Sequence, residues 1–157
     1  MASLVNQPKN MNPLADVQFK FVIGALPNVT FFVQSTALPG ITLAPLDIGL
    51  PQRTGFARNT GVIEYEELNV AFLVDEYLKN YVSIWNWMMD KDGANTSAIL
   101  TLLSSHMNPF MEVHFNGVFP IGLSELLFDS TTAEPDYKVA NLTMSYKNYT
   151  IKNLIND

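Results

Sequence analysis

The side chains that could do acid–base chemistry in this sequence are a small set of carboxylates. Glu64, Glu66 and Glu67 form the densest carboxylate cluster. Two acids on one strand face could hydrolyse a glycoside if a partner acid lay opposite them. Because the sequence supplies neither an apolar pocket around one acid nor a platform for a sugar, we favour an acidic strand that faces solvent, an interface or a lumen.

The remaining candidates for chemistry are two histidines, His106 and His114. Their spacing does not match a helical metal pair, and a site using Glu112 beside His114 is disfavoured against a solvated strand face. The sequence has no cysteine, which excludes thiol nucleophiles, disulfides and zinc thiolate sites. It also lacks a G-x-S-x-G elbow, a phosphate loop and a dinucleotide fingerprint. We therefore expect no enzyme, no metal and no cofactor.

Composition points toward a single domain with an unusually uncharged surface. The chain has 157 residues, of which 48% are hydrophobic and only 15% charged, against a usual charged share of about 25%. Either much of the surface meets other protein, or the surface of a β-rich domain is covered by uncharged polar residues. The net charge of −6 disfavours binding to nucleic acid. No secretory signal opens the chain and no apolar run reaches the about 20 residues needed to cross a bilayer, so we expect a cytoplasmic protein.

Apolar residues alternate with polar ones in most of the chain, which predicts a mainly β fold with about seven strands and one main helix. The strands expected are 17–23 and 29–35, which we predict to pair as a hairpin, then 62–74, 111–115 ending at Phe119–Pro120, and 140–146. Residues 99–103 fit a strand or a short helix.

The predicted helix runs from Asp75, which can cap its first turn, to Met89. Tyr81 and Trp85 fall on one apolar stripe together with Tyr77 and Met88. Trp85 and Trp87 lie two residues apart and cannot both face one core. One of them is expected to contact a neighbouring element or subunit, and the alternative for Trp87 is partial burial against a loop of its own domain.

Two segments are interpreted as contact regions. Residues 1–14 lack periodicity and are predicted to be an N-terminal arm, followed by one domain over 15–157. Residues 51–61 are predicted to be a long loop that carries Arg53, Phe56 and Arg58. A flexible, basic and aromatic loop suggests a contact arm, whereas the alternative is a surface loop whose Phe56 folds back onto the core.

These segments, in their order, resemble the tail tube protein family of contractile-tailed bacteriophages. The resemblance covers about residues 15 to 148 and follows the polar arm, the two early strands and Thr36-Ala37-Leu38-Pro39-Gly40. It continues with Glu64 to Phe72 running into Val74-Asp75-Glu76. It ends with Asn116-Gly117-Val118-Phe119-Pro120, Leu123-Ser124-Glu125-Leu126 and a closing strand.

The resemblance implies a tail-tube β-barrel or sandwich that completes a shared barrel in a ring oligomer. Hexameric rings would stack into the inner tail tube, with sheath protein outside and tape-measure protein and passing DNA inside. Baseplate and tail terminator proteins would lie at the ends of the tube, in the virion tail, and assembly would occur in the host cytoplasm without a membrane. The family's inter-ring loop corresponds here to 51–61, with Arg53, Phe56 and Arg58 as contacts.

Three alternatives remain at this point. The chain could be a baseplate tube-initiator ring, or the tube protein of a related contractile injection system. More distantly, it could be a β-sandwich binding module that holds a ligand with exposed aromatic residues. A hydrolase using Glu64 or Glu66 is the enzyme alternative, and it would lose turnover when both are changed to glutamine.

Overall fold

The computed structural model describes residues 14, 18–26, 29, 32–49, 55–90, 93, 95–131 and 136–155, with the backbone alone for 46–49 and 55–60. Its elements are β1 (Phe19–Ile23), β2 (Val33–Thr36), β3 (Ile41–Gly49), β4 (Gly55–Tyr65), β5 (Leu68–Leu73), α2 (Lys79–Met89), β6 (Thr96–Leu103), β7 (Pro109–Leu123), β8 (Val139–Ser145) and β9 (Asn148–Asn153). This part of the chain is mainly β with one main helix, as the alternation predicted.

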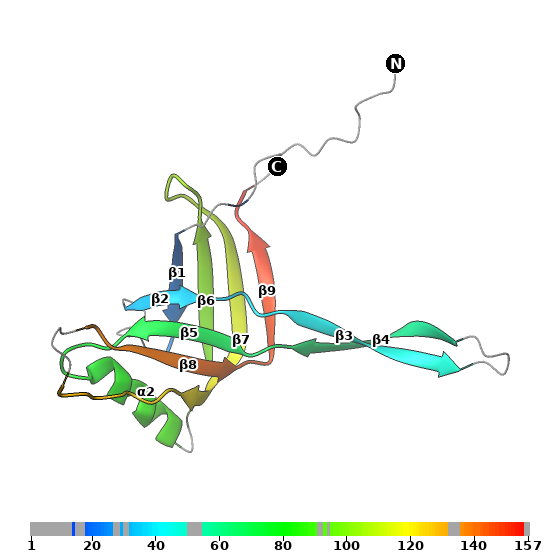
Figure 1. The fold of residues 1–157 in the computed structure, drawn as a ribbon. Helices are drawn as coiled ribbons and strands as arrows, with labels where there is room; N and C mark the ends of the chain where they lie inside the picture. The colour runs from blue at the N-terminus through cyan, green and yellow to red at the C-terminus, as the bar shows by residue number, and fades with distance from the viewer. Residues whose placement is uncertain are drawn as a thin grey trace.

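The strands of the body form two layers that share β7. Hydrogen bonds join the strands in the order β1-β6-β7-β8-β5-β2, and β9 pairs with β7 beside this path. Residues 111–116 of β7 pair with β9, whereas residues 119–123 pair with β8. Figure 1 shows the consequence: β1, β6, β7 and β9 run one way, and β2, β5 and β8 cross them.

Gly117 lies where β7 passes from one layer to the other. Its φ of +66° is in the left-handed region, which residues with a Cβ rarely adopt. The pairing of β7 with β8 then shifts register between Pro120 and Gly122. A proline is tolerated at such an irregularity, so the strand continues to Leu123. The prediction that Phe119–Pro120 ends this strand is therefore wrong.

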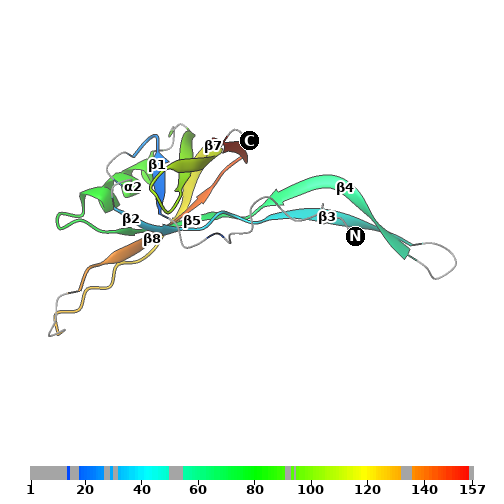
Figure 2. The same cartoon turned by 90° about the horizontal axis from the view of Figure 1, so that it is seen from above.

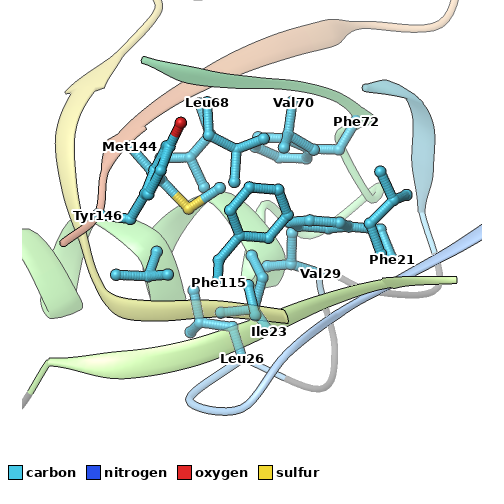
Figure 3. Close-up of a cluster of buried hydrophobic side chains, with 14 of the residues drawn as sticks. Phe21, Ile23, Leu26, Val29, Leu68, Val70, Phe72, Phe115, Met144 and Tyr146 are labelled. Atoms are coloured by element: carbon cyan, nitrogen blue, oxygen red, sulfur yellow. The ribbon is translucent and has the colours of Figure 1, made fainter. Parts of the chain in front are cut away.

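The core lies between the two layers and is built by the predicted alternation (Figure 3). In β5 the residues Leu68, Val70 and Phe72 are fully buried. Ala140, Leu142 and Met144 of β8 are buried beside them. The opposite layer contributes, among others, Phe21, Ile23, Leu100, Val113 and Phe115.

The early strands do not form the predicted hairpin. β1 pairs with β6, and β2 pairs with β5, at opposite ends of the strand order. Backbone hydrogen bonds from Leu26 to Ile23 and from Val29 to Leu26 turn the chain between the strands, and Val29 is fully buried. The two strands therefore belong to different layers, and each pairs with a strand that is distant in the sequence.

The helix α2 begins later than predicted. Its N-cap residue is Leu78, with a left-handed φ of 57°. The Oδ1 atom of Asp75 nevertheless accepts a hydrogen bond of 2.6 Å from the backbone N–H of Lys79, so the expected acceptor does serve the first turn. The face toward the core is made by Asn80, Ile84 and Trp87.

Candidate functional site

The most extended surface of the molecule is a two-stranded antiparallel ribbon, residues 41–49 of β3 and 55–65 of β4, which projects from the body (Figures 1 and 2). Near the body, the side chains of Ile41, Leu43, Val62 and Ile63 are all exposed. Single exposed apolar residues are common, but Ile41, Leu43 and Ile63 share one face of the ribbon, and such a group marks an interaction surface. The ribbon is therefore a candidate assembly element.

The ribbon corrects the predicted loop over 51–61. Residues 55–61 are part of β4, with Phe56 opposite Ile48 and Arg58 opposite Leu46 in the ladder. The side chains of Phe56 and Arg58, and the whole of Arg53, lie outside the described part, as do residues 1–13 of the predicted arm. Their contact roles stay predictions. The loop was inferred from glycines, prolines and arginines that a solvent-exposed ribbon tolerates, because both of its strands are edges.

Glu66 fastens the base of the ribbon to the body. Its backbone N–H donates to the carbonyl oxygen of Gly40 at 3.0 Å, and its Oε2 accepts from the N–H of Gly40 at 3.3 Å. The hydroxyl of Tyr146 donates to the carbonyl oxygen of Glu66 at 2.8 Å. Glu64 lies on β4 and Glu67 between β4 and β5, both exposed. The acidic cluster thus lies at and beside a junction, and its predicted lumen or interface role stays a prediction.

An aromatic cluster of Tyr65, Phe115, Tyr146 and Tyr149 lies behind this junction. The ring centroids of Tyr65 and Tyr149 are 5.5 Å apart, and those of Phe115 and Tyr146 are 5.2 Å apart. Burial, and then the neighbouring Tyr149, Tyr65 and Glu66, raise the pKa of the Tyr146 phenol to about 12. Because Tyr65 is the last residue of β4, the cluster anchors the ribbon to the core.

A groove lies at the opposite end of β5, with a volume of about 600 Å³. It is lined by Phe32, Leu73, Val74, Asp75, Glu76, Leu78, Leu126, Phe128, Asp136, Tyr137 and Lys138. The backbone N–H of Val74 donates to the carbonyl oxygen of Lys138 at 2.9 Å and so joins two of its walls. The side chains of Phe128 and Tyr137 are 71% and 84% exposed. No sequence pattern pointed to this groove, because its walls come from four separate segments.

The helix residues singled out from the sequence divide between core and surface. Tyr81 and Trp87 pack against the core, and the hydroxyl of Tyr81 donates to the carbonyl oxygen of Ser124 at 3.0 Å. Trp85 is 49% exposed, and Tyr77 is also exposed, so the predicted stripe is rotated from the face that the helix buries. Trp85 keeps its predicted role as a candidate subunit contact.

The histidines form no metal site with the other described residues. The Nε2 of His114 lies 3.0 Å from Oε2 of Glu112, as the shared strand face suggested, and both side chains are about one-third exposed or less. His106 lies in an exposed turn. Among the described residues there is no group of three or more histidine and acidic side chains that could hold a metal ion. Within the same part of the chain, no helix has the length and apolar character needed to span a membrane.

Comparison with known proteins gives a consistent set of relatives, although no family model matches the sequence. Over 166 aligned positions the chain is 25% identical to the tail tube terminator protein of Enterobacteria phage T4, covering 97% of this chain and 93% of that protein. A chain in the sheath/tube terminator structure of the PVC extracellular contractile injection system matches with a TM-score of 0.72 and 14% identity, covering 90% of this chain and 97% of that one.

Two further structures extend the comparison. A chain in the tube-terminating cap of the anti-feeding prophage has a TM-score of 0.70 and 15% identity, covering 98% and 99% of the two chains. A chain of the PVC sheath–tube complex has a TM-score of 0.69 and 14% identity, covering 92% and 94%. The resemblance to contractile tail tube proteins and the tail-tube fold are therefore confirmed.

Proposed function

We propose that this chain is a contractile-tail tube protein, a structural subunit whose copies form a closed ring at an end of the tail tube. The observation that carries the proposal is the nearly end-to-end alignment with a tail tube terminator protein. The similarity of the fold to chains in two terminator or cap structures supports it. A subunit of this kind works by binding its neighbours and needs no catalytic turnover.

The ribbon supplies the physical basis for a ring. It exposes Ile41, Leu43, Val62 and Ile63 near its base, and association would remove this apolar surface from water. Both edges of a two-stranded ribbon also carry backbone groups that a neighbouring strand can pair with. Contact between different surfaces of successive copies generates a closed ring when the rotation between them closes.

The finer prediction from the sequence, a main-tube subunit in stacked hexameric rings, is the second candidate. The match to a chain of a sheath–tube complex favours it. In that role tape-measure protein and DNA pass through the lumen, sheath protein lies outside, and the net charge of −6 reduces sticking of DNA. An initiator ring fits similarly, since a chain of a baseplate structure also matches. Each role places the protein in the virion tail, after assembly in the host cytoplasm.

Electron microscopy of the purified full chain, concentrated stepwise, separates these roles. Closed single or double rings that do not grow are expected for an end ring. Long hollow tubes would instead establish a self-polymerising main-tube subunit. If the chain stays monomeric, it should be mixed with preformed tubes of its own system. Absence of binding at the tube ends would then contradict the proposed end position.

Charge reversal in the segment 51–61 tests the predicted inter-ring contact. The double variant Arg53→Glu, Arg58→Glu should weaken ring stacking or end binding without unfolding the domain, because Arg58 belongs to the projecting two-stranded ribbon and not to the sheets that enclose the core. Lys147→Glu, at an exposed position between β8 and β9, is the matched control. Normal association of the double variant would show that this segment takes no part in the contact between rings.

The enzyme alternative is tested by Glu64→Gln, Glu66→Gln. A structural subunit shows no glycoside turnover before or after the change. Measured turnover in the unmodified chain that disappears in the double variant would contradict the structural role. Saturable glycan binding by a stable monomer would favour the binding module instead.

A further inference from the structure

The groove and the ribbon lie at opposite ends of β5. The ribbon joins the body through Glu66, just before Leu68, whereas Leu73 at the other end of the strand lines the groove. Six residues of extended strand separate the two ends by about 20 Å. Figures 1 and 2 show the ribbon pointing away from the end of the molecule that carries α2. One copy cannot fill its own groove with its ribbon, but a neighbour in the same orientation can.

The chemistry of the groove calls for an apolar and basic occupant. Its floor and walls carry large apolar side chains, among them Phe32, Leu78 and Leu126. Three carboxylates, those of Asp75, Glu76 and Asp136, line it against the single ammonium of Lys138. A cation that enters a partly enclosed site with excess negative charge is favoured more than one on an open surface.

The chain contains a segment of this chemistry at the ribbon tip. Residues 50–58 read Leu-Pro-Gln-Arg-Thr-Gly-Phe-Ala-Arg, with two arginines around one phenylalanine and no acid. Aromatic and arginine side chains are the residues that most often anchor protein interfaces. The segment 1–14 is a poorer candidate, because it has one lysine, Lys9, and no aromatic residue.

We propose that the groove receives the ribbon tip, residues 50–58, of a second copy of this chain. Phe56 enters the apolar part, and Arg53 and Arg58 meet the carboxylates of Asp75, Glu76 and Asp136. The contact is head-to-tail, so each copy offers one tip and one groove. The inference rests on the proposed function, since a head-to-tail contact of this kind is what links successive subunits in a ring or between rings.

Engineered cysteines test the contact directly, because the chain has no cysteine that would add background. Thr54→Cys protein, which keeps Phe56, is mixed with Tyr137→Cys protein under mild oxidation, and disulfide-linked dimers are measured on non-reducing gels. Disulfides need Cα atoms within about 7 Å, so a docked tip should raise the mixed dimer at least about fivefold over the control pair. The control pair is Thr54→Cys with Lys147→Cys, whose second cysteine lies at an exposed position away from the groove. Equal yields from the two pairs would overturn the proposal.

Charge exchange provides a second, independent readout by sedimentation. Arg53→Glu, Arg58→Glu and Glu76→Lys, Asp136→Lys should each weaken self-association about tenfold, because attraction becomes repulsion at two positions. A mixture of the two double variants should regain self-association through alternating copies, since the acidic tip of one variant fits the basic groove of the other, and the basic tip of the second fits the acidic groove of the first. Failure to regain association, with both variants folded, would contradict the pairing of tip with groove.

The outcomes separate this contact from the proposed function. Rings seen by electron microscopy together with control-level crosslinking would support the proposed function and contradict the proposed contact between tip and groove. Specific crosslinking without rings or tube-end binding would support the proposed contact and contradict the proposed function. An apolar small molecule is the other occupant that a groove of about 600 Å³ suits, and control-level crosslinking with unchanged self-association in both charge variants would leave the groove to such a ligand.

Discussion

Asn80→Ala should be one of the most destabilising single substitutions on α2. Asn80 is a buried polar residue that links three backbone positions around the groove. Its Nδ2 donates to the carbonyl oxygen of Leu73 at 2.7 Å. Its Oδ1 accepts from the N–H of Asp75 at 3.2 Å and from that of Tyr81 at 2.8 Å. The side chain therefore holds the end of β5, the following turn and the start of α2 together.

The magnitude follows from these three hydrogen bonds. Each contributes about 1 kcal/mol net, and a buried group left without its partner costs about 1–3 kcal/mol. Part of the loss is recovered because alanine favours a helix over asparagine by about half a kcal/mol. The free energy of unfolding should therefore fall by about 3 kcal/mol. For a chain of 157 residues this corresponds to a Tm lower by about 6–12 °C.

The measurement is urea unfolding followed by circular dichroism, with the free energy taken from the midpoint and slope. Asn86→Ala is the matched control, because Asn86 is exposed on the same helix. It should change the free energy of unfolding by less than about 0.5 kcal/mol. A difference between the two variants below about 1 kcal/mol would refute the reasoning, since the three bonds would then add little to stability.

Three further variants test other parts of the fold. Tyr146→Phe should lower the free energy of unfolding by about 1 kcal/mol, because it removes the hydrogen bond to Glu66. Folding raises the pKa of this phenol from 10.0 to about 12, so its contribution to stability is complete below pH 10 and is lost as the pH rises through about 12. The variant should lack this loss when the free energy of unfolding is measured against pH. Trp87→Ala should lower the free energy of unfolding by about 2–3 kcal/mol, whereas Trp85→Ala should leave it within about 0.5 kcal/mol; equal losses in denaturant melts would contradict the orientation of α2. Gly117→Ala should cost about 1–2 kcal/mol through its left-handed backbone, and an unchanged Tm would contradict that conformation.

Local sequence patterns determined the elements whose structure depends on their own residues. Alternation placed Leu68, Val70 and Phe72 on one buried face, because side chains alternate along any strand whatever its partner. Asp75 was recognised as an acceptor for the helix start, since a carboxylate near free backbone N–H groups binds them locally. The ordered set of motifs was also enough to recognise the tail-tube fold.

Other features were decided by contacts between distant residues. The pairing of β1 with β6 places Phe19 opposite Leu102, and the residues of β1 alone do not identify β6 as the partner strand. β9 carries little alternation, and it becomes a strand because the edge of β7 is available to it. Pro120 stays within β7 because a register shift accommodates it. In each case the ladder partner supplies hydrogen bonds that the local pattern cannot reveal.

The candidate surfaces divide in the same way. The sequence alone identified Arg53, Phe56 and Arg58 as an apolar and basic segment, because residue types are sufficient for that. The tertiary structure decided that part of this segment lies on a projecting ribbon, and it placed Trp85 outside and Trp87 inside. It alone produced the groove, whose walls are brought together from Phe32, Leu73, Leu126 and Tyr137. A cavity depends on how separate segments pack in space, and no local pattern of residues encodes that arrangement.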